Sequence, residues 1–167
     1  MSNWLEEPLD TPAAWHGEDL VNRDDWIVTL DSAQTDELLS ASKAIETEGK
    51  SWKDAMRVDY PVPAWSDLVA RLRSQLEGGL GFALIRSLPV DGVSTDLARL
   101  MLWGIGQHVG YPEPQDAAGN LLHDVRDTGK NLKTDNIRAY QTHLPINYHN
   151  DGADAFMLLC YRTARSG

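Results

Sequence analysis

The chain has 167 residues, with 15 Lys and Arg against 25 Asp and Glu and a formal net charge of -10. A hydrophobic fraction of 42% is typical of a folded globular protein and argues against disorder of the whole chain. The acidic balance argues against binding to nucleic acid or to an anionic membrane, because neutralising phosphates needs surplus cations. No apolar run approaches the roughly 20 residues of a membrane-spanning helix, and residues 1–7 lack the basic and apolar regions of a secretory signal. One cysteine, Cys160, fits a reducing compartment, so we expect a cytoplasmic protein.

Residues 1–63 are predicted to form an N-terminal arm and a first helix. The arm carries three tryptophans that are spaced too widely for a single helical face: Trp4, Trp15 and Trp26. We therefore expect these indoles to pack the arm onto a body that lies later in the chain. Residues 64–167 are predicted to form the remainder of the fold.

Apolar periodicity with start and stop signals predicts three helices: 32–48, 64–77 and 95–109. Asp31 or Ser32 can cap the first helix, and Gly49 can end it. In the second helix, five apolar side chains follow a 3.6-residue period on one face: Trp65, Leu68, Val69, Leu72 and Leu76. Ser94 or Thr95 can cap the third helix.

Short apolar runs predict strands at four places: 81–88, 121–126, 137–142 and 155–162. The run 155–161 is almost wholly apolar, which predicts a central buried strand with Cys160 as an inert buried thiol. Gly104 and Gly106 in the third helix are expected to mark close helix–sheet contacts. Helices first and strands later indicate an α+β class. Because only six residues follow the apolar run, we expect the chain to be the N-terminal part of a longer protein.

The sharpest local signal is the sequence His149-Asn150-Asp151 followed by Gly152. On an extended strand, residues i and i+2 point to the same face, so this spacing predicts an imidazole nitrogen and a carboxylate oxygen side by side. They would supply two of the three ligands of a facial triad of two His and one carboxylate, which suits Fe(II) and leaves positions open for reactants. Gly152 would let the strand bend away from the ligands.

Five tracts in a fixed order resemble the TauD/TfdA-like branch of the Fe(II)/2-oxoglutarate-dependent dioxygenases: GFALIRSLP (81–89), GQHVGYP (106–112), YQTH (140–143), HNDGAD (149–154) and LCYRTARSG (159–167). The resemblance runs from about residue 64 to the last residue. It implies helices packed on a double-stranded β-helix, a cupin-like jelly-roll core that is incomplete in this chain. Residues 64–167 would be the first part of that dioxygenase domain.

The resemblance also implies a metal site, cofactors and reactants. His149 and Asp151 match the first two iron ligands of the family, so the implied cofactors are Fe(II) and 2-oxoglutarate. The implied reaction oxidises a small-molecule substrate with O2 and releases succinate and CO2. Among the other histidines, His143 is the one predicted to reach the pocket rim as a substrate contact, whereas His108 and His123 are predicted to be hydrogen-bonded packing residues.

The sequence departs from the family pattern after Asp151. The family's second histidine ligand and its 2-oxoglutarate-binding arginine lie far downstream of the first two ligands, and no residue here matches either of them. A metal with two protein ligands is held weakly, and the cosubstrate carboxylate would lack its bidentate partner. We therefore predict that the 167-residue chain alone is inactive.

Two other classes stay open at this stage. One is a non-catalytic binding or assembly module, and the other is a cupin-like metal-dependent isomerase or hydrolase that needs no 2-oxoglutarate. Titration with a divalent metal separates a complete site from a module without one. The sequence is compatible with a homo-oligomer.

Overall fold

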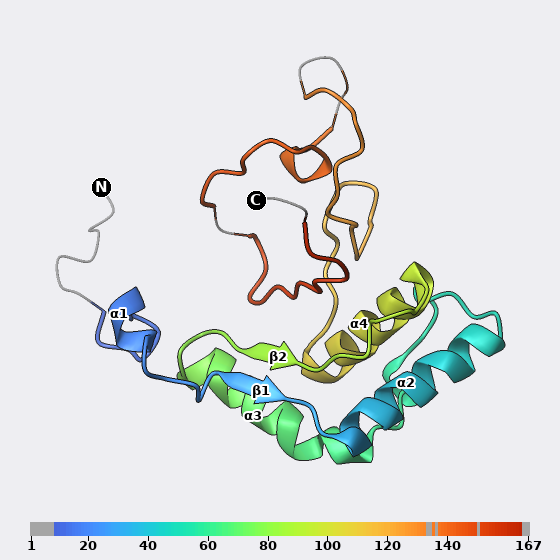
Figure 1. Cartoon of the computed structure of the whole chain (residues 1–167), viewed down its shortest axis with the longest axis horizontal. Coiled ribbons are helices and arrows are strands. Elements are labelled where there is room, and N and C mark those ends of the chain that lie inside the picture. Colours follow the sequence, from blue (N-terminus) through green and yellow to red (C-terminus); the bar gives the residue numbers. More distant parts are fainter. Residues whose placement is uncertain (1–8, 133–134, 136, 150, 165–167) are drawn as a thin grey trace. The chain divides into compact units, whose positions relative to one another are not determined.

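The computed structural model describes residues 9–132, 135, 137–149 and 151–164. The chain divides into two compact units, one of residues up to Tyr111 with those from Leu158 onward, and one of Pro112–Met157. The described elements, in chain order, are α1 (Gly17–Leu20), β1 (Ile27–Thr29), α2 (Ser32–Thr47), the 3-10 helices η1 (Arg57–Asp59) and η2 (Pro63–Trp65), α3 (Ser66–Gly78), β2 (Leu84–Arg86), α4 (Thr95–Val109) and the 3-10 helix η3 (Ala139–Gln141) (Figure 1).

The three predicted helices are confirmed, and their starts follow from side-chain caps. Asp31 Oδ1 accepts a hydrogen bond from the Gln34 backbone N at 2.8 Å, and the Gln34 side chain accepts one from the Asp31 backbone N. This reciprocal capping box satisfies two of the N–H groups that a helix start leaves unpaired. Ser94 Oγ caps α4 in the same way by accepting from Leu97 N at 3.0 Å.

The apolar faces of α2, α3 and α4 form the core of the first unit together with β1. Its buried members are Val28, Leu30, Leu38, Val62, Trp65, Leu68, Leu72, Met101 and Ile105. Each large apolar side chain that is removed from water here contributes roughly 1.5–3 kcal/mol. Trp65 also donates its indole N–H to the Gln34 backbone O at 2.8 Å, which fixes the start of α3 against α2.

The sheet of the first unit is small. Strands β1 and β2 pair in parallel, with Ile27 opposite Leu84, Val28 opposite Ile85 and Thr29 opposite Arg86. The strand predicted over 81–88 is therefore present but shorter. The expectation that it is buried is wrong, because Leu84 is 40% exposed.

Two of the predicted arm anchors pack against the same ring. The Trp15 ring centroid lies 5.1 Å from that of Phe82, and the Trp26 centroid lies 5.3 Å from it. Trp15 also donates its indole N–H to the Leu80 backbone O at 2.9 Å. These contacts confirm that both indoles anchor the arm to a later part of the chain, while Trp4 lies outside the described residues.

Gly104 makes a close contact, but the partner differs from the expected sheet. A Cβ atom at this position would lie 2.5 Å from Cε1 of Tyr60, so the Tyr60 ring packs directly onto the backbone of α4. Tyr60 is 1% exposed and donates its hydroxyl to the Leu100 backbone O at 2.9 Å. Burial raises the pKa of this hydroxyl well above its ordinary value.

The later predicted strands are absent from this structure. Segments 121–126 and 155–162 have no strand, and η3 replaces the strand predicted over 137–142. A strand needs backbone partners, and no described residue forms a ladder with these segments. Phe156 is 68% exposed and Cys160 is exposed too, so the predicted burial of this run and of its thiol is wrong here. The double-stranded β-helix implied by the resemblance stays a prediction.

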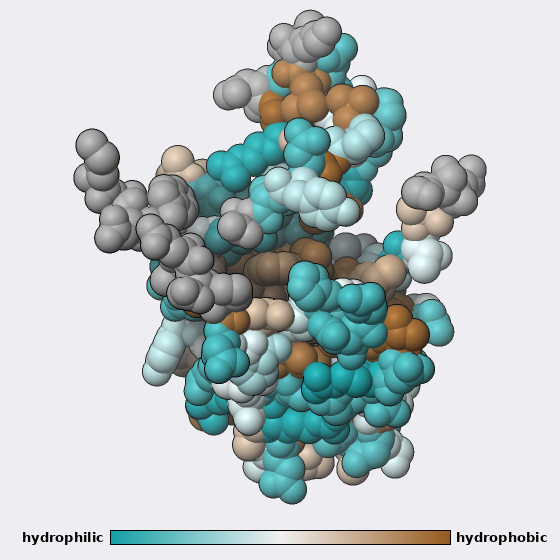
Figure 2. Space-filling view, turned by 90° about the vertical axis from the view of Figure 1, so that its left-hand side faces the viewer, coloured by the Kyte–Doolittle hydropathy of each residue, from teal (hydrophilic) through white to brown (hydrophobic). Residues whose placement is uncertain are grey.

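The protein surface carries many of the polar residues of this acidic sequence (Figure 2). Hydrophilic residues cover most of the face drawn in Figure 2, and hydrophobic residues reach the surface between them. Among the described residues, no helix combines the length and apolar character that crossing a bilayer requires.

Candidate functional site

The predicted convergence of His149 and Asp151 is present in the unit Pro112–Met157. His149 Nε2 lies 3.7 Å from Asp151 Oδ1, and the two side chains are 59% and 49% exposed. Neither residue belongs to a strand, so the local backbone brings the side chains together without a sheet. The distance is longer than a normal hydrogen bond, so no direct hydrogen bond joins the two atoms.

The backbone just before the pair orients the imidazole. His149 Nδ1 lies 2.8 Å from the Asn147 backbone O. A carbonyl oxygen can only accept a hydrogen bond, so Nδ1 is the donor in this contact. In a neutral ring, Nε2 then carries the free electron pair, and it is the nitrogen that faces Asp151.

His143 is paired with a different carboxylate. Its Nδ1 lies 3.3 Å from Asp127 Oδ2, and the imidazole side chain is 78% exposed. Asp127 also accepts from the backbone N of Gly129 at 2.8 Å, which fixes the turn that presents it. The predicted role of His143 as a substrate contact stays a prediction.

A third imidazole–carboxylate pair was not predicted. His123 Nε2 lies 3.2 Å from Asp116 Oδ2, and the His123 and Tyr140 ring centroids are 5.5 Å apart. Asp116 accepts from Ala118 N, from Asn120 N and from Asn120 Nδ2. The Asn120 side-chain hydrogen bond is the largest cause that lowers the pKa of Asp116. The sequence signal for this turn is an Asp followed by Gly119-Asn120, since Gly119 adopts a positive φ of 78°.

His108, on α4, has the packing role that was predicted for it. Its Nε2 lies 3.0 Å from the Tyr60 backbone O, and its own backbone O accepts from Arg73 Nη2 at 3.1 Å. Burial is the main cause that lowers the pKa of His108. Both ends of this residue are therefore used by the helix packing.

The chemistry of the donor set at His149 and Asp151 fits a divalent first-row metal. An imidazole nitrogen and a carboxylate oxygen are ligands that Fe(II) takes in facial triads. Within the described ranges, no third His, Cys, Asp or Glu joins them in a group that could hold a metal ion. This pair can therefore supply two positions of a coordination sphere.

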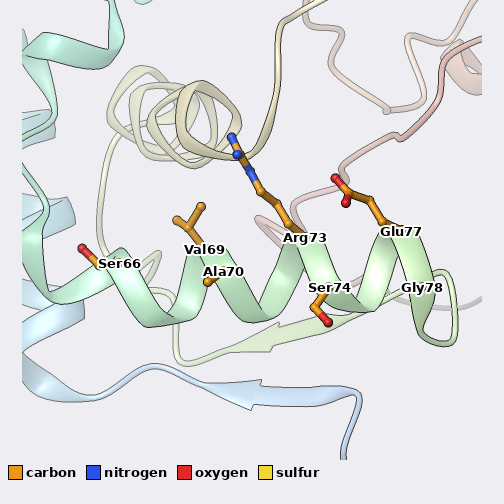
Figure 3. A pocket seen from close by; sticks show the side chains of 7 residues that line it. All are labelled: Ser66, Val69, Ala70, Arg73, Ser74, Glu77 and Gly78. Atoms are coloured by element: carbon orange, nitrogen blue, oxygen red, sulfur yellow. The ribbon is translucent and has the colours of Figure 1, made fainter.

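A surface depression lies along α3 in the first unit. It has a volume of about 640 Å³ and is lined by Ser66, Val69, Ala70, Arg73, Ser74, Glu77 and Gly78. Figure 3 shows Val69, Arg73 and Glu77 on the same side of the helix, with Arg73 extended toward the end of α4. Because the Arg73 guanidinium bonds the His108 carbonyl, its polar head serves helix packing.

Comparison with known proteins gives one informative similarity. The chain is 30% identical over 164 residues to FR-33289 synthase of Streptomyces rubellomurinus (strain ATCC 31215). The match covers 98% of this chain and 48% of the relative, so the chain spans about half the length of the curated protein it matches. No family model matches the chain. The similarity therefore relates this chain to part of an enzyme that is named a synthase.

Proposed function

We propose that the gene product containing this chain is an Fe(II)- and 2-oxoglutarate-dependent oxygenase that oxidises a small molecule. The observation that carries the proposal is the approach of His149 Nε2 to within 3.7 Å of Asp151 Oδ1. The similarity to an enzyme named a synthase supports a catalytic role over a purely structural one. The ordered tracts of the TauD/TfdA-like resemblance supply the reaction class and the proposed jelly-roll core.

In this proposal, each residue of the pair has a distinct task. His149 presents the Nε2 electron pair, and Asp151 presents a carboxylate oxygen on the same side of the chain. Together they would supply one neutral and one anionic ligand to a single cation, and a second histidine that no residue of this chain matches would complete the triad beside the positions for 2-oxoglutarate and O2. Fe(II), when bound, supplies the redox chemistry that couples decarboxylation of 2-oxoglutarate to oxidation of the substrate.

The chain's own contribution beyond the two ligands is orientation. The Asn147 carbonyl bond restricts rotation of the His149 ring, and such outer contacts commonly fix both the tautomer and the direction of a metal-binding histidine. His143, held by Asp127, is proposed to contact the substrate at the rim of the site.

Succinate formation tests the proposal. The full-length gene product is incubated with Fe(II), ascorbate, 2-oxoglutarate and candidate small-molecule substrates, and succinate is measured. Turnover should be lost in His149→Ala and in Asp151→Ala, and retained in the control Cys160→Ser, whose exposed thiol is not one of the proposed ligands. Turnover that persists in both ligand variants would eliminate the assignment.

A further inference from the structure

We infer that the Asn147 backbone carbonyl holds His149 in the Nδ1–H tautomer and so selects Nε2 as the metal-binding atom. The inference rests on the proposed function for its consequence, but the tautomer itself is a property of the metal-free chain. It assigns a positioning role to a backbone group two residues before the histidine.

The first step is the chemistry of the contact. The Nδ1 to Asn147 O distance of 2.8 Å is that of a good N–H···O hydrogen bond. Because the carbonyl has no hydrogen to give, the proton must be on Nδ1. Free histidine in water favours the opposite tautomer, with the proton on Nε2, so the contact selects the form that is less populated without it.

The second step is the direction of the other nitrogen. With Nδ1 protonated, the Nε2 electron pair faces Asp151 Oδ1 at 3.7 Å. Two electron-rich atoms at this distance have no hydrogen between them, and a cation placed between them relieves their repulsion. The contact therefore prepares His149 as a ligand before any metal arrives.

His123 in the same unit provides a matched internal control. Its Nε2, not its Nδ1, lies 3.2 Å from the Asp116 carboxylate. A carboxylate that accepts from three other donors is ionised and can only accept. No hydrogen bond joins His123 Nε2 to this carboxylate in the structure, but the negative oxygen 3.2 Å away favours a proton on Nε2 by charge. We therefore expect the Nε2–H tautomer for His123 and the Nδ1–H tautomer for His149.

Long-range 1H–15N correlation spectra of the 15N-labelled, metal-free chain test the inference. The spectra are recorded over a series of rising pH values, and the chemical shifts at the upper plateau report the tautomers of the neutral rings. The signals of His149 are identified by their loss in His149→Gln. We expect mainly Nδ1–H at His149 and mainly Nε2–H at His123. A majority of Nε2–H at His149 would overturn the inference.

Two variants of Tyr148 test whether the backbone holds the contact. The Tyr148 side chain is fully exposed, so Tyr148→Ala and Tyr148→Gly remove the same surface group and differ in backbone freedom. We expect the ratio of Nδ1–H to Nε2–H at His149 to fall by about two- to fivefold in Tyr148→Gly relative to Tyr148→Ala. Equal ratios of Nδ1–H to Nε2–H in the two variants would show that the backbone at residue 148 does not maintain the contact between His149 and the Asn147 carbonyl.

The failures of the two proposals are distinguishable. Co(II) titration of the full-length gene product measures metal binding independently of the tautomer. Binding at His149 and Asp151 with a majority Nε2–H ring in the metal-free chain would leave the oxygenase proposal standing and reject the inference. A majority Nδ1–H ring would confirm the inference, and a full-length gene product that binds no Co(II) at the pair would count against the proposed function.

Discussion

The contact between Gly104 and Tyr60 determines whether an alanine at position 104 stabilises or destabilises the fold. In an open helix, Gly→Ala stabilises by about 1 kcal/mol because Ala has the higher helix propensity. At Gly104, however, the added Cβ would lie 2.5 Å from Cε1 and 2.6 Å from Cδ1 of Tyr60. The Tyr60 ring is 1% exposed and is held by its hydroxyl on Leu100, so it has little room to move.

The change in the free energy of unfolding in Gly104→Ala is the sum of a packing cost and a gain in helix propensity. Overpacking of a tight core costs about 1–3 kcal/mol, and displacing the ring also loses a hydrogen bond with a net value of about 1 kcal/mol. The gain in helix propensity offsets about 1 kcal/mol of this cost. We therefore expect Gly104→Ala to lower the free energy of unfolding by about 2 kcal/mol, taking the middle of these ranges.

Urea unfolding followed by helical circular dichroism measures this effect. Gly78→Ala, at the end of α3 with no atom within 4 Å of the new Cβ, is the matched control and should be neutral or slightly stabilising. In a Tyr60→Leu background the obstructing ring is gone, so Gly104→Ala should become stabilising by about 1 kcal/mol. A Gly104→Ala chain as stable as the parent with Tyr60 in place would refute the reasoning.

Three further predictions concern the same unit. Ser42 is 0% exposed and its Oγ has no hydrogen-bond partner among the described atoms, so Ser42→Ala should raise the free energy of unfolding by about 1 kcal/mol, measured by urea titration. The Lys50 side-chain hydrogen bond, with a second bond from Met56 N, lowers the pKa of Asp59 below 3.8. A carboxylate whose pKa is lower in the folded than in the unfolded chain stabilises the fold at high pH, and this stabilisation is lost as the pH falls through the folded-state pKa. In Lys50→Met, the free energy of unfolding should therefore fall less between pH 6 and pH 2 than in the parent. An unchanged pH profile would contradict the assignment. Trp15→Phe keeps a ring near Phe82 but loses the bond to Leu80 O, so amide exchange around residues 13–18 should accelerate about fivefold; exchange as slow as in the parent would show that the bond does not hold the arm.

The helices were predictable because their signals are local. Asp31 and Ser94 cap the helices that they were expected to cap, and the apolar side chains of α3 point into the core as their 3.6-residue period requires. The approach of His149 to Asp151 agrees with the spacing of two residues, but the strand that was expected to produce it is absent from both residues.

The parts that sequence reasoning missed depend on partners distant in the chain. The run around Phe156 has strand composition, but composition alone cannot supply the backbone ladder that makes a strand. The contact of Gly104 with Tyr60 joins residues 44 positions apart, so the glycine predicted a close approach without naming the partner. The pairing of Asp127 with His143 spans a loop without periodicity, which leaves no pattern to detect.

The central claim is that His149 and Asp151 bind one divalent metal together. Mn(II) is a redox-stable and paramagnetic substitute for Fe(II), and its addition to the 15N-labelled chain broadens the amide signals nearest to the bound ion. We predict that substoichiometric Mn(II) broadens the signals around residues 149–151 first, and that this selectivity disappears in His149→Ala and in Asp151→Ala but not in His143→Ala. Broadening that is strongest at other carboxylates of this acidic chain, or that is the same in all four proteins, would contradict the account.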